Sequence, residues 1–444
     1  MTTEAVGSPA EPILDEELAV ASRATTISAG ARGSILFWLG GLIILAGFGG
    51  PTGWLIGLPI SFFLKNKLHL SAEQVAIFGA IVHIPLYVGF LFGLARDRLN
   101  LFGMKDRGLL LVFGGVCAAF YVAFAFIPPS YASLLAAQTL ILICFSFTVA
   151  ALTGAMSTLG QQNVMSGRVS VAWNVFGYVP GMVAMLAGGA LSDLMEREGA
   201  AHATRLLFLV GAALAVLIAL YGVWKPKAVF DNYRVERPAS HFFEDIKRLV
   251  RCRPVWIALL IWSLWTFAPG GGTPLQYFLQ NHLHAKDAAW GQWNAIWSFS
   301  FIPTFLLYGF VCTKFPLRPL LWWGTVFAVP QFVALAFVHT IGAALLAAVP
   351  MGLLGGFASA AYMDLIIRSC PKGLQGTVMM AAAAAYQIVY RSGDILGTDL
   401  YQRFHGFTVC VIAITVVYAL ILPTLLLVPK WISATADGEA VQAA

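Results

Sequence analysis

The chain has 444 residues, of which 59% are hydrophobic and only 11% are charged. Soluble domains carry about a quarter charged residues, so most of this chain must be solvated by lipid. The net charge of +6 is explained by basic loops on one side of a membrane rather than by a nucleic-acid-binding surface, and the six cysteines form no CxxC pair or metal-ligand cluster.

The hydrophobic pattern predicts an all-α membrane protein with twelve transmembrane helices, because twelve apolar runs are long enough to cross about 30 Å of hydrocarbon. These runs lie at 34–63, 72–95, 108–127, 131–157, 168–192, 204–224, 254–281, 289–312, 317–338, 341–367, 374–398 and 406–429. Six of them fall in an N-terminal bundle at 34–224 and six in a C-terminal bundle at 254–430. The polar segment 225–253 is expected to be a cytoplasmic linker with a short amphipathic helix on the membrane surface, and 1–33 and 431–444 to be mobile cytoplasmic tails.

Orientation follows from the distribution of basic residues. With both termini inside, 20 of the 27 Lys and Arg residues fall on the inner side, and six fall in the outer loops. Cytoplasmic loops gather Lys and Arg, so we expect a multi-pass protein with both termini cytoplasmic, in the plasma (inner) membrane if bacterial.

The two halves share a repeated segment. PISFFLKNKLH at 59–69 and PLQYFLQNHLH at 274–284 have Pro, Phe, Leu, Asn, Leu and His in the same places. Each follows or overlaps a Gly/Pro-rich stretch, at 47–53 and 268–274. Duplicated apolar halves with paired helix interruptions are typical of a transporter whose binding site lies between the halves.

The turn between the second and third runs carries a motif, GLARDRLNLFGMKDRG at 93–108. Gly93, Asp97, Arg98 and Arg107 resemble the signature G-x-x-x-D-R-x-G-R-[KR] of the major facilitator superfamily, with a stretched turn before the second glycine. Glycines allow close helix approach, and a carboxylate among cations can join one half to the other. The alternative is a basic loop that only obeys the positive-inside rule.

The segments 59–98 and 361–397 resemble the folate–biopterin transporter branch of that superfamily, to which muropeptide permeases and light-harvesting assembly factors are related. This resemblance implies the major facilitator fold, in which two pseudo-symmetric six-helix bundles are related by an axis along the membrane normal. It also implies alternating access and a pterin- or folate-like solute.

Ionisable residues inside the predicted spans are the first candidates for a role in transport. Arg391 is a candidate anchor for an anionic solute, and Asp394, three residues later on the same face, can pair with it or exchange a proton. The alternative is a structural ion pair near the outer rim. Asp364 and Arg368, spaced i, i+4, and Arg168 at the start of the fifth run are assigned to an inner gate or a structural charge network.

Polar and aromatic residues at midplane depth are candidates for the substrate-binding cavity: Asn174, Tyr178, Trp265, Gln276, Tyr386, Gln387 and Tyr390. Trp265 and Gln276 flank the second Gly/Pro stretch and suit a planar aromatic solute. The tyrosines and Asn174 can instead serve helix–helix hydrogen bonding. His83 is either protonatable or a neutral histidine bonded to a neighbouring carbonyl.

The predicted function is therefore secondary active transport of a small organic solute, pterin- or folate-like or another organic anion, by a monomer. No Walker A sequence is present, so a proton or ion gradient is the expected energy source, with Asp394, Asp364 and His83 as candidate carriers. No nucleophile–base arrangement, metal cluster or cofactor motif points to an enzyme. Two alternatives stay open: a non-transporting membrane assembly factor of the same fold, and a muropeptide or sugar permease.

Overall fold

The computed structural model describes residues 27–197, 200–231, 233, 242–285, 287–404 and 406–439, and within these ranges the regular structure is entirely helical. The N-terminal half contains α2 (Ala29–Gly49), α3 (Gly57–Asn66), α4 (Ala72–Val82), α5 (Ile84–Tyr87), α6 (Phe90–Arg98), η1 (Leu101–Gly103), α7 (Asp106–Ala125), α8 (Tyr131–Gln162), α9 (Ser166–Arg197) and α10 (Ala200–Val223). The linker contains α11 (Lys227–Phe230) and α12 (Phe242–Arg251). The C-terminal half contains α13 (Arg253–Thr266), α14 (Thr273–Tyr277), η2 (Phe278–His282), α15 (Asp287–Val311), α16 (Leu317–Ala328), η3 (Val333–Phe337), α17 (Ile341–Ser369), α18 (Gln375–Phe404), α19 (Phe407–Ala419), α20 (Ile421–Leu425) and α21 (Lys430–Ser433).

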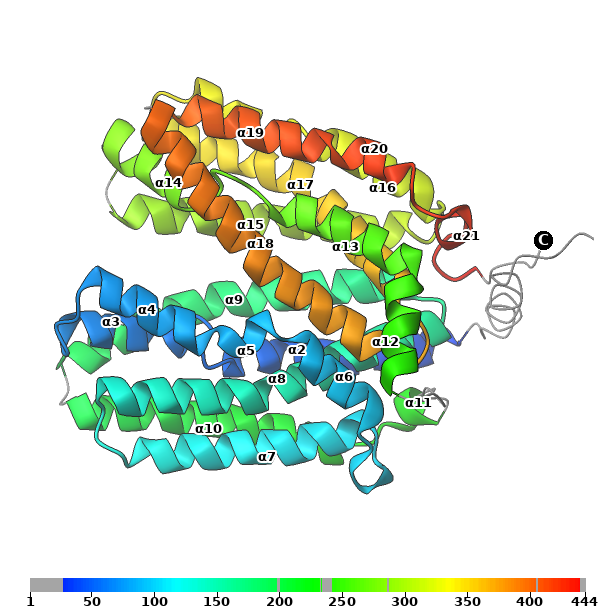
Figure 1. The fold of residues 1–444 in the computed structure, drawn as a ribbon, viewed down its shortest axis with the longest axis horizontal. Coiled ribbons are helices and arrows are strands. Elements are labelled where there is room, and N and C mark those ends of the chain that lie inside the picture. The colour runs from blue at the N-terminus through cyan, green and yellow to red at the C-terminus, as the bar shows by residue number, and fades with distance from the viewer. Residues whose placement is uncertain are drawn as a thin grey trace, which may run out of the picture.

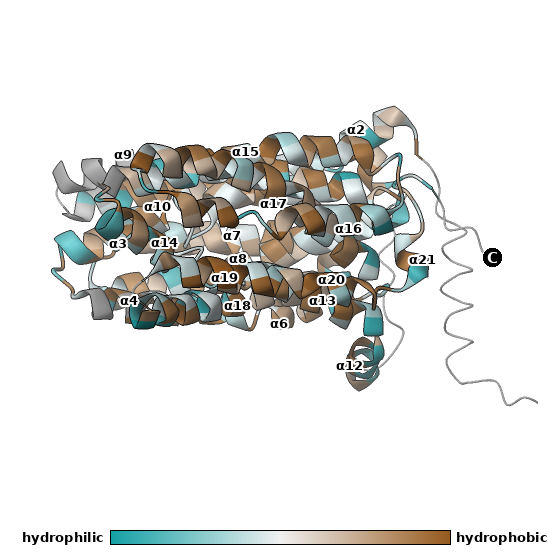
Figure 2. Cartoon of the chain, turned by 90° about the horizontal axis from the view of Figure 1, so that it is seen from above, coloured by the Kyte–Doolittle hydropathy of each residue, from teal (hydrophilic) through white to brown (hydrophobic). Residues whose placement is uncertain are grey.

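The helices form two bundles, one from each half of the chain, lying side by side with their long axes roughly parallel (Figure 1). Hydrophobic residues run along the length of the helices, and hydrophilic residues gather toward the ends (Figure 2). Helices α9 and α18 connect the bundles, since α9 packs against α15 and α17, and α18 packs against α5, α6 and α8. The end where α6 meets α18 is the one that the charge distribution assigns to the cytoplasm, and it is termed the inner end.

Eight of the described helices are long and apolar enough to cross a membrane alone, and a ninth candidate joins α12 to α13 across a bend of 66°. The prediction of an all-helical membrane protein is confirmed. Several of the twelve predicted runs are instead built from short pieces, such as α2 with α3 and α4 with α5 and α6. The number of twelve membrane crossings therefore stays a prediction. The order of the long and short helices along the chain is compatible with it.

The Gly/Pro stretches interrupt the first and seventh runs as expected. Between α2 and α3, the amide of Gln138 on α8 donates to the carbonyl of Pro51 at 3.0 Å. Between α13 and α14, Gly270 adopts a φ of +121°, a backbone conformation that glycine adopts without strain. Its amide nitrogen lies so close to Gly397 of α18 that a Cβ there would overlap it.

The C-terminal segment corrects one expectation. Residues 431–439 are not a free tail, because Ser433 and Asp437 are buried and the segment packs across the inner end, where Figure 1 places α21. The predicted mobile tail was wrong for this stretch. Residues 1–26 and 440–444 lie outside the described part of the chain.

Candidate functional site

The signature carboxylate joins the two bundles at the inner end. Asp97, at the end of α6, accepts hydrogen bonds from the backbone N–H groups of Gly376 at 3.0 Å and Thr377 at 2.8 Å. The hydroxyl of Thr377 donates to the same carboxylate at 2.7 Å. Gly93 lies against the carbonyl of Gly376, where a Cβ would overlap backbone atoms. The motif predicted a close approach of two helices and a carboxylate that joins the two halves. The contacts of Gly93 and Asp97 have this geometry.

A buried arginine that sequence reasoning overlooked completes this contact. Arg96 donates to Asp97 at 2.8 Å and to Asp106 at 2.5 Å, and all three side chains are buried. Tyr233, from the linker, also donates to Asp106. The only signal for Arg96 was its place beside Asp97, and its neighbour Arg98 looked equally basic. The guanidinium between the two buried carboxylates offsets part of the cost of burying them.

The other two predicted gating residues of this motif bond elsewhere. Arg98 forms an ion pair with Asp245 of the linker helix α12 at 2.6 Å. Arg107 donates to the carbonyl of Val223 at 2.7 Å, within the N-terminal bundle. Among the described residues, Arg107 therefore ties α7 to the end of α10 and makes no hydrogen bond or ion pair with the C-terminal bundle.

A second set of contacts joins α17 to α9. Asp364 is fully buried and accepts from Tyr308 at 2.8 Å and from Arg368 at 2.8 Å, so the predicted i, i+4 pair exists. Arg368 also donates to Ser166 at the start of α9 at 3.0 Å. Together, Asp97, Ser166, Asp364, Arg368 and Thr377 are named the inner gate, because they hydrogen-bond one bundle to the other or position a side chain that does.

The C-terminal segment covers this inner gate. Asp437 accepts from the N–H of Gly167 at 3.0 Å and lies 3.5 Å from Arg168, which places Arg168 in the predicted inner charge network. Its own N–H donates to the carbonyl of Cys312 at 2.8 Å, so one residue contacts both bundles. Burial, and secondarily the nearby carboxylate of Asp364, raises the pKa of Asp437 to about 6. Nothing in the sequence pattern of 431–439 pointed to this role.

Aromatic residues from both bundles meet near the middle of the molecule. The ring of Tyr178 on α9 contacts Phe301 and Phe305 of α15, each with 5.4 Å between ring centroids. On α18, Tyr386 and Tyr390 stack at 5.9 Å and are each 40% exposed. Tyr178 lies within electrostatic range of Tyr386. Three of the predicted cavity residues are thus brought together between the bundles.

Arg391 and Asp394 do not pair as predicted. Asp394 instead accepts from the N–H of Thr273 at 2.7 Å and from its hydroxyl at 2.8 Å, which holds α18 to the start of α14. Arg391 is exposed and makes no hydrogen bond or ion pair with any residue in the described ranges. The carboxylate of Asp394 bonds at the break between α13 and α14, because the backbone N–H and the hydroxyl of Thr273 both donate to it there. The guanidinium is left available.

His83 lies where the N-terminal bundle faces this guanidinium. Its Nδ1 is 2.6 Å from the carbonyl of Gly79, one turn earlier in α4, and Arg391 lies within electrostatic range of the ring. The contact to a carbonyl matches the second alternative considered for this histidine and leaves Nε2 for another partner.

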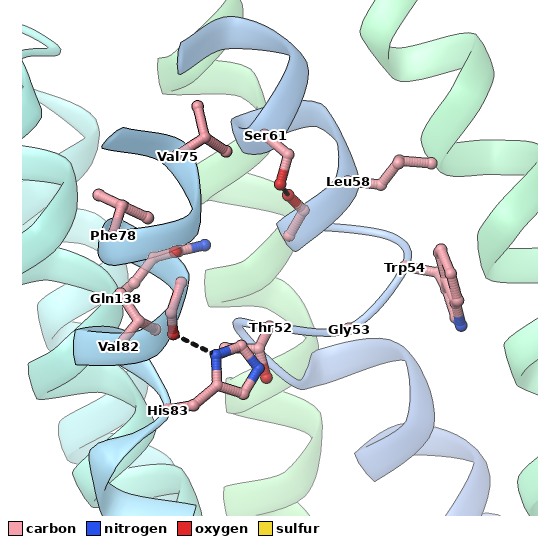
Figure 3. A pocket seen from close by; sticks show the side chains of 12 residues that line it. Thr52, Gly53, Trp54, Leu58, Ser61, Val75, Phe78, Val82, His83 and Gln138 are labelled. Atoms are coloured by element: carbon pink, nitrogen blue, oxygen red, sulfur yellow. Dashed lines mark hydrogen bonds between the residues drawn. The ribbon is translucent and has the colours of Figure 1, made fainter. Parts of the chain in front are cut away.

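A cavity of about 200 Å³ opens beside His83, at the break between α2 and α3 (Figure 3). Polar groups of Thr52, Ser61, His83 and Gln138 line it with the rings of Trp54 and Phe78. Drug-sized ligands usually occupy about 300–1,000 Å³, so this cavity by itself suits only part of a solute.

The remaining predicted residues divide into two groups. Asn174 is buried and donates to the carbonyl of Ser170 on its own helix at 2.9 Å, and Trp265 stacks on Tyr418 at 4.9 Å inside the C-terminal bundle. Both have structural partners. Gln276 and Gln387 are half-buried, and neither side chain hydrogen-bonds to another residue of the described ranges.

Comparisons with known proteins agree with this architecture. The model of the family described as Major Facilitator Superfamily matches residues 166–390, which is half of the chain. A folate-biopterin transporter of Synechocystis sp. (strain ATCC 27184 / PCC 6803 / Kazusa) is 23% identical over 277 residues, covering 61% of this chain and 53% of the relative. The chain thus spans about half the length of the curated relative that it matches.

Two solved structures have the same fold. FucP, a Major Facilitator Superfamily transporter in the outward conformation, matches with a TM-score of 0.68 at 14% identity, over 89% of this chain and 98% of that one. The human organic anion transporter MFSD10 (TETRAN) matches with a TM-score of 0.61 at 14% identity, over 90% of this chain and 100% of that one. At this identity the likeness concerns the fold alone.

Proposed function

The chain belongs to the Major Facilitator Superfamily, a family of membrane transporters, and we propose that it carries a small organic anion across the membrane by alternating access. The two bundles would rock about a solute held between them. The observation that carries this proposal is Arg391, an exposed guanidinium on α18, a helix predicted to span the membrane. It faces the opposite bundle without a carboxylate partner in the described ranges. An unpaired charge at this depth is costly, so an anion is its natural partner.

The surroundings of Arg391 favour a flat, aromatic anion. Tyr386 and Tyr390 present stacked rings on the same helix, each 40% exposed, and an aromatic solute can stack against such faces. His83 offers a nitrogen from the facing bundle. A pterin- or folate-like solute combines a planar ring with acceptor or anionic groups, and the curated relative bears the name folate-biopterin transporter.

The contacts of the inner gate favour a state that is closed at the inner end. In this state the solute would enter from the outer end, and release inside would require the bonds of Asp97 and Arg368 to break. We assign proton coupling to Asp394 and His83, which border the proposed solute site. Asp364 is a weaker candidate because it is already bonded to Tyr308 and Arg368, and one of these partners must be displaced before it exchanges a proton.

The test is uptake by purified protein in proteoliposomes, after a thermal-shift screen with folate, biopterin, fucose and a muropeptide fragment. We expect stabilisation by folate or biopterin and uptake driven by an imposed proton gradient. Replacement of Arg391 by Ala should lower uptake at least tenfold, whereas Arg391→Lys should retain part of it. Arg403→Ala is the matched control, because Arg403 lies at the far end of the same helix in an exposed pair with Asp399.

Each outcome separates the hypotheses. Full uptake by the Arg391→Ala variant would remove Arg391 from the site. Stabilisation by fucose or the muropeptide fragment alone would overturn the pterin-like substrate and leave the transport class standing. A wild-type protein that transports none of these solutes but co-purifies with a pigment–protein complex would favour the assembly-factor alternative.

A further inference from the structure

The linker helix α12 is held against both bundles by one of its faces. Asp245 is buried and forms the ion pair with Arg98 of the N-terminal bundle at 2.6 Å. Arg248 donates to the carbonyl of Lys372, between α17 and α18, at 3.2 Å. The helix crosses the inner end at an angle to the spans and is bent by 66° from α13. Its position is therefore set relative to both halves.

The opposite side of α12 carries an apolar stripe. Phe243 is 80% exposed, Ile246 is 37% exposed and Val250 is 60% exposed. These positions are three and four residues apart, so they lie on one side of the helix, away from Asp245. The cations Lys247 and Arg251 lie along one edge of this stripe, and both are exposed. Figure 2 shows α12 projecting beyond the side of the bundle.

The height of this stripe relative to the membrane follows from chain continuity. The apolar span α13 begins at Arg253, directly after α12 ends, so the helix lies at the level where hydrocarbon gives way to headgroups. Trp256, half exposed in the first turn of α13, donates its indole N–H to the carbonyl of Val250 at 3.0 Å. Tryptophan is enriched at this membrane depth.

We propose that the stripe of Phe243, Ile246 and Val250, with Lys247 and Arg251, binds anionic phospholipid of the leaflet at the inner end. The apolar side chains enter the boundary between headgroups and acyl chains, and the two cations contact headgroup phosphates. An apolar stripe flanked by Lys and Arg at the start of a membrane span has the chemistry of a lipid surface. To bind a soluble protein partner, the stripe would have to project away from the membrane into the aqueous phase.

Binding in this position has a consequence for the inner gate. Because Asp245 is paired with Arg98, the residue after Asp97, anionic lipid that immobilises α12 also supports the closed inner end. This second step rests on the proposed alternating-access function, whereas lipid binding by α12 does not.

The experiment measures the depth of spin labels on the full-length protein in vesicles of phosphatidylcholine, with or without about a third phosphatidylglycerol. One variant carries the label at Val250→Cys, and the matched control carries it at Glu244→Cys. Both are made in a Cys252→Ser background. The Cys252→Ser protein without an introduced cysteine, treated with the same label, is the blank. We expect the label at 250 to relax more with oxygen than with a water-soluble nickel chelate, and the label at 244 to show the reverse. Phosphatidylglycerol should raise the oxygen-to-nickel ratio at 250 at least twofold.

A Lys247→Gln, Arg251→Gln double variant tests the charge contribution. It should lose the effect of phosphatidylglycerol, while Lys65→Gln with Arg403→Gln, at the other end of the molecule, should keep it. A label at 250 that is as accessible to nickel as the label at 244 would overturn the lipid assignment in favour of a protein partner. An unchanged ratio on adding phosphatidylglycerol would overturn the requirement for anionic lipid. Neither readout depends on transport, so failure here is distinguishable from failure of the proposed function.

Discussion

At the scale of single residues, carboxylates of this protein are held by different kinds of partner. Asp97 and Asp394 accept from backbone N–H groups and threonine hydroxyls at the starts of helices. Asp437 accepts from a backbone N–H but lies near two arginines and a second carboxylate. Protonation therefore has different consequences at each position.

The pH dependence of the C-terminal segment follows from Asp437. Its pKa is about 6 when docked against an ordinary value of 3.8, so the docked form binds a proton more tightly. Docking is thus favoured at low pH and weakens as the pH rises through 6. Between pH 5 and 7.5 the change is about 1.4 kcal/mol, or about tenfold in the docking equilibrium. The cleavage rate of the segment by proteinase K should rise accordingly over this range.

The variant Asp437→Asn removes the titration but keeps an acceptor for the N–H of Gly167. We expect cleavage that is slow at both pH values, because the neutral side chain avoids the cost of burying a charge near Asp364. Asp399→Asn, on the exposed outer part of α18, should behave as wild type. If cleavage of the Asp437→Asn variant still accelerates as the pH rises, the titrating group is not Asp437.

The contact between Asp394 and Thr273 separates a structural role from a coupling role. Thr273→Val removes one hydroxyl bond and should cost about 1 kcal/mol, while Asp394→Asn weakens two bonds to a charged group and should cost about 1.5–3 kcal/mol. Thermal melts measure both. If Asp394 carries the proton, uptake by Asp394→Asn becomes independent of the proton gradient, whereas Thr273→Val keeps that dependence. Equal gradient dependence in the two variants would make Asp394 purely structural.

At the scale of elements, the contact of α6 with α18 depends on the absence of a side chain at Gly93. A Cβ at this position would meet the backbone of Gly376 and Thr377, which cannot move aside as a flexible side chain would. Overpacking of this kind typically costs about 1–3 kcal/mol. The closed inner end should therefore be specifically sensitive to alanine at 93.

We expect Gly93→Ala to open the inner end and to increase the modification rate of Cys370, a buried native cysteine beside the inner gate, by a membrane-permeable maleimide. Gly79→Ala in α4 is the matched control, because an added Cβ there meets no atom within 4 Å. Alanine at 79 should be neutral or slightly stabilising through helix propensity. Equal modification rates in the two variants would contradict the role of Gly93.

At the scale of the whole molecule, alternating access requires α9 and α17 to separate at the inner end. The hydroxyl of Ser170 donates to the carbonyl of Ala360 at 2.7 Å, so α9 and α17 are in direct contact at these two positions, which we choose for a cross-link. The double variant Ser170→Cys, Ala360→Cys should lose most uptake when oxidised and recover it on reduction. The native chain, treated with the same oxidant, controls for its own cysteines. Uptake by the fully cross-linked protein would exclude separation at this contact as part of the cycle.

Much of the fold and part of the site were predictable from sequence. The hydrophobic runs and the repeated segments predicted an all-helical membrane protein in two halves, and the Gly93–Arg107 motif predicted the superfamily, which the family match confirms. The i, i+4 pair of Asp364 and Arg368 was also predicted correctly, because both residues lie on one helix and its periodicity determines their distance. Local spacing is sufficient for such cases.

Partner choice was not predictable. Asp394 and Arg391 share a helix face, yet Asp394 bonds to Thr273, which is distant in sequence. Arg96 and Arg98 flank the same aspartate, but only Arg96 is buried with it. The docking of Asp437 depends on groups from α9, α15 and α17 that meet only in the folded molecule.

By itself, the sequence determined which segments are solvated by lipid, where helices are interrupted and that the chain consists of two similar halves. These properties follow from side-chain hydrophobicity and backbone preference, which act locally. Only the tertiary structure decided which charges are paired, that Arg391 has no bonded partner among the described residues, and that the C-terminal segment covers the inner end. Hydrogen bonds and ion pairs act over a few ångströms, so they depend on which helices pack together and not on spacing along the chain.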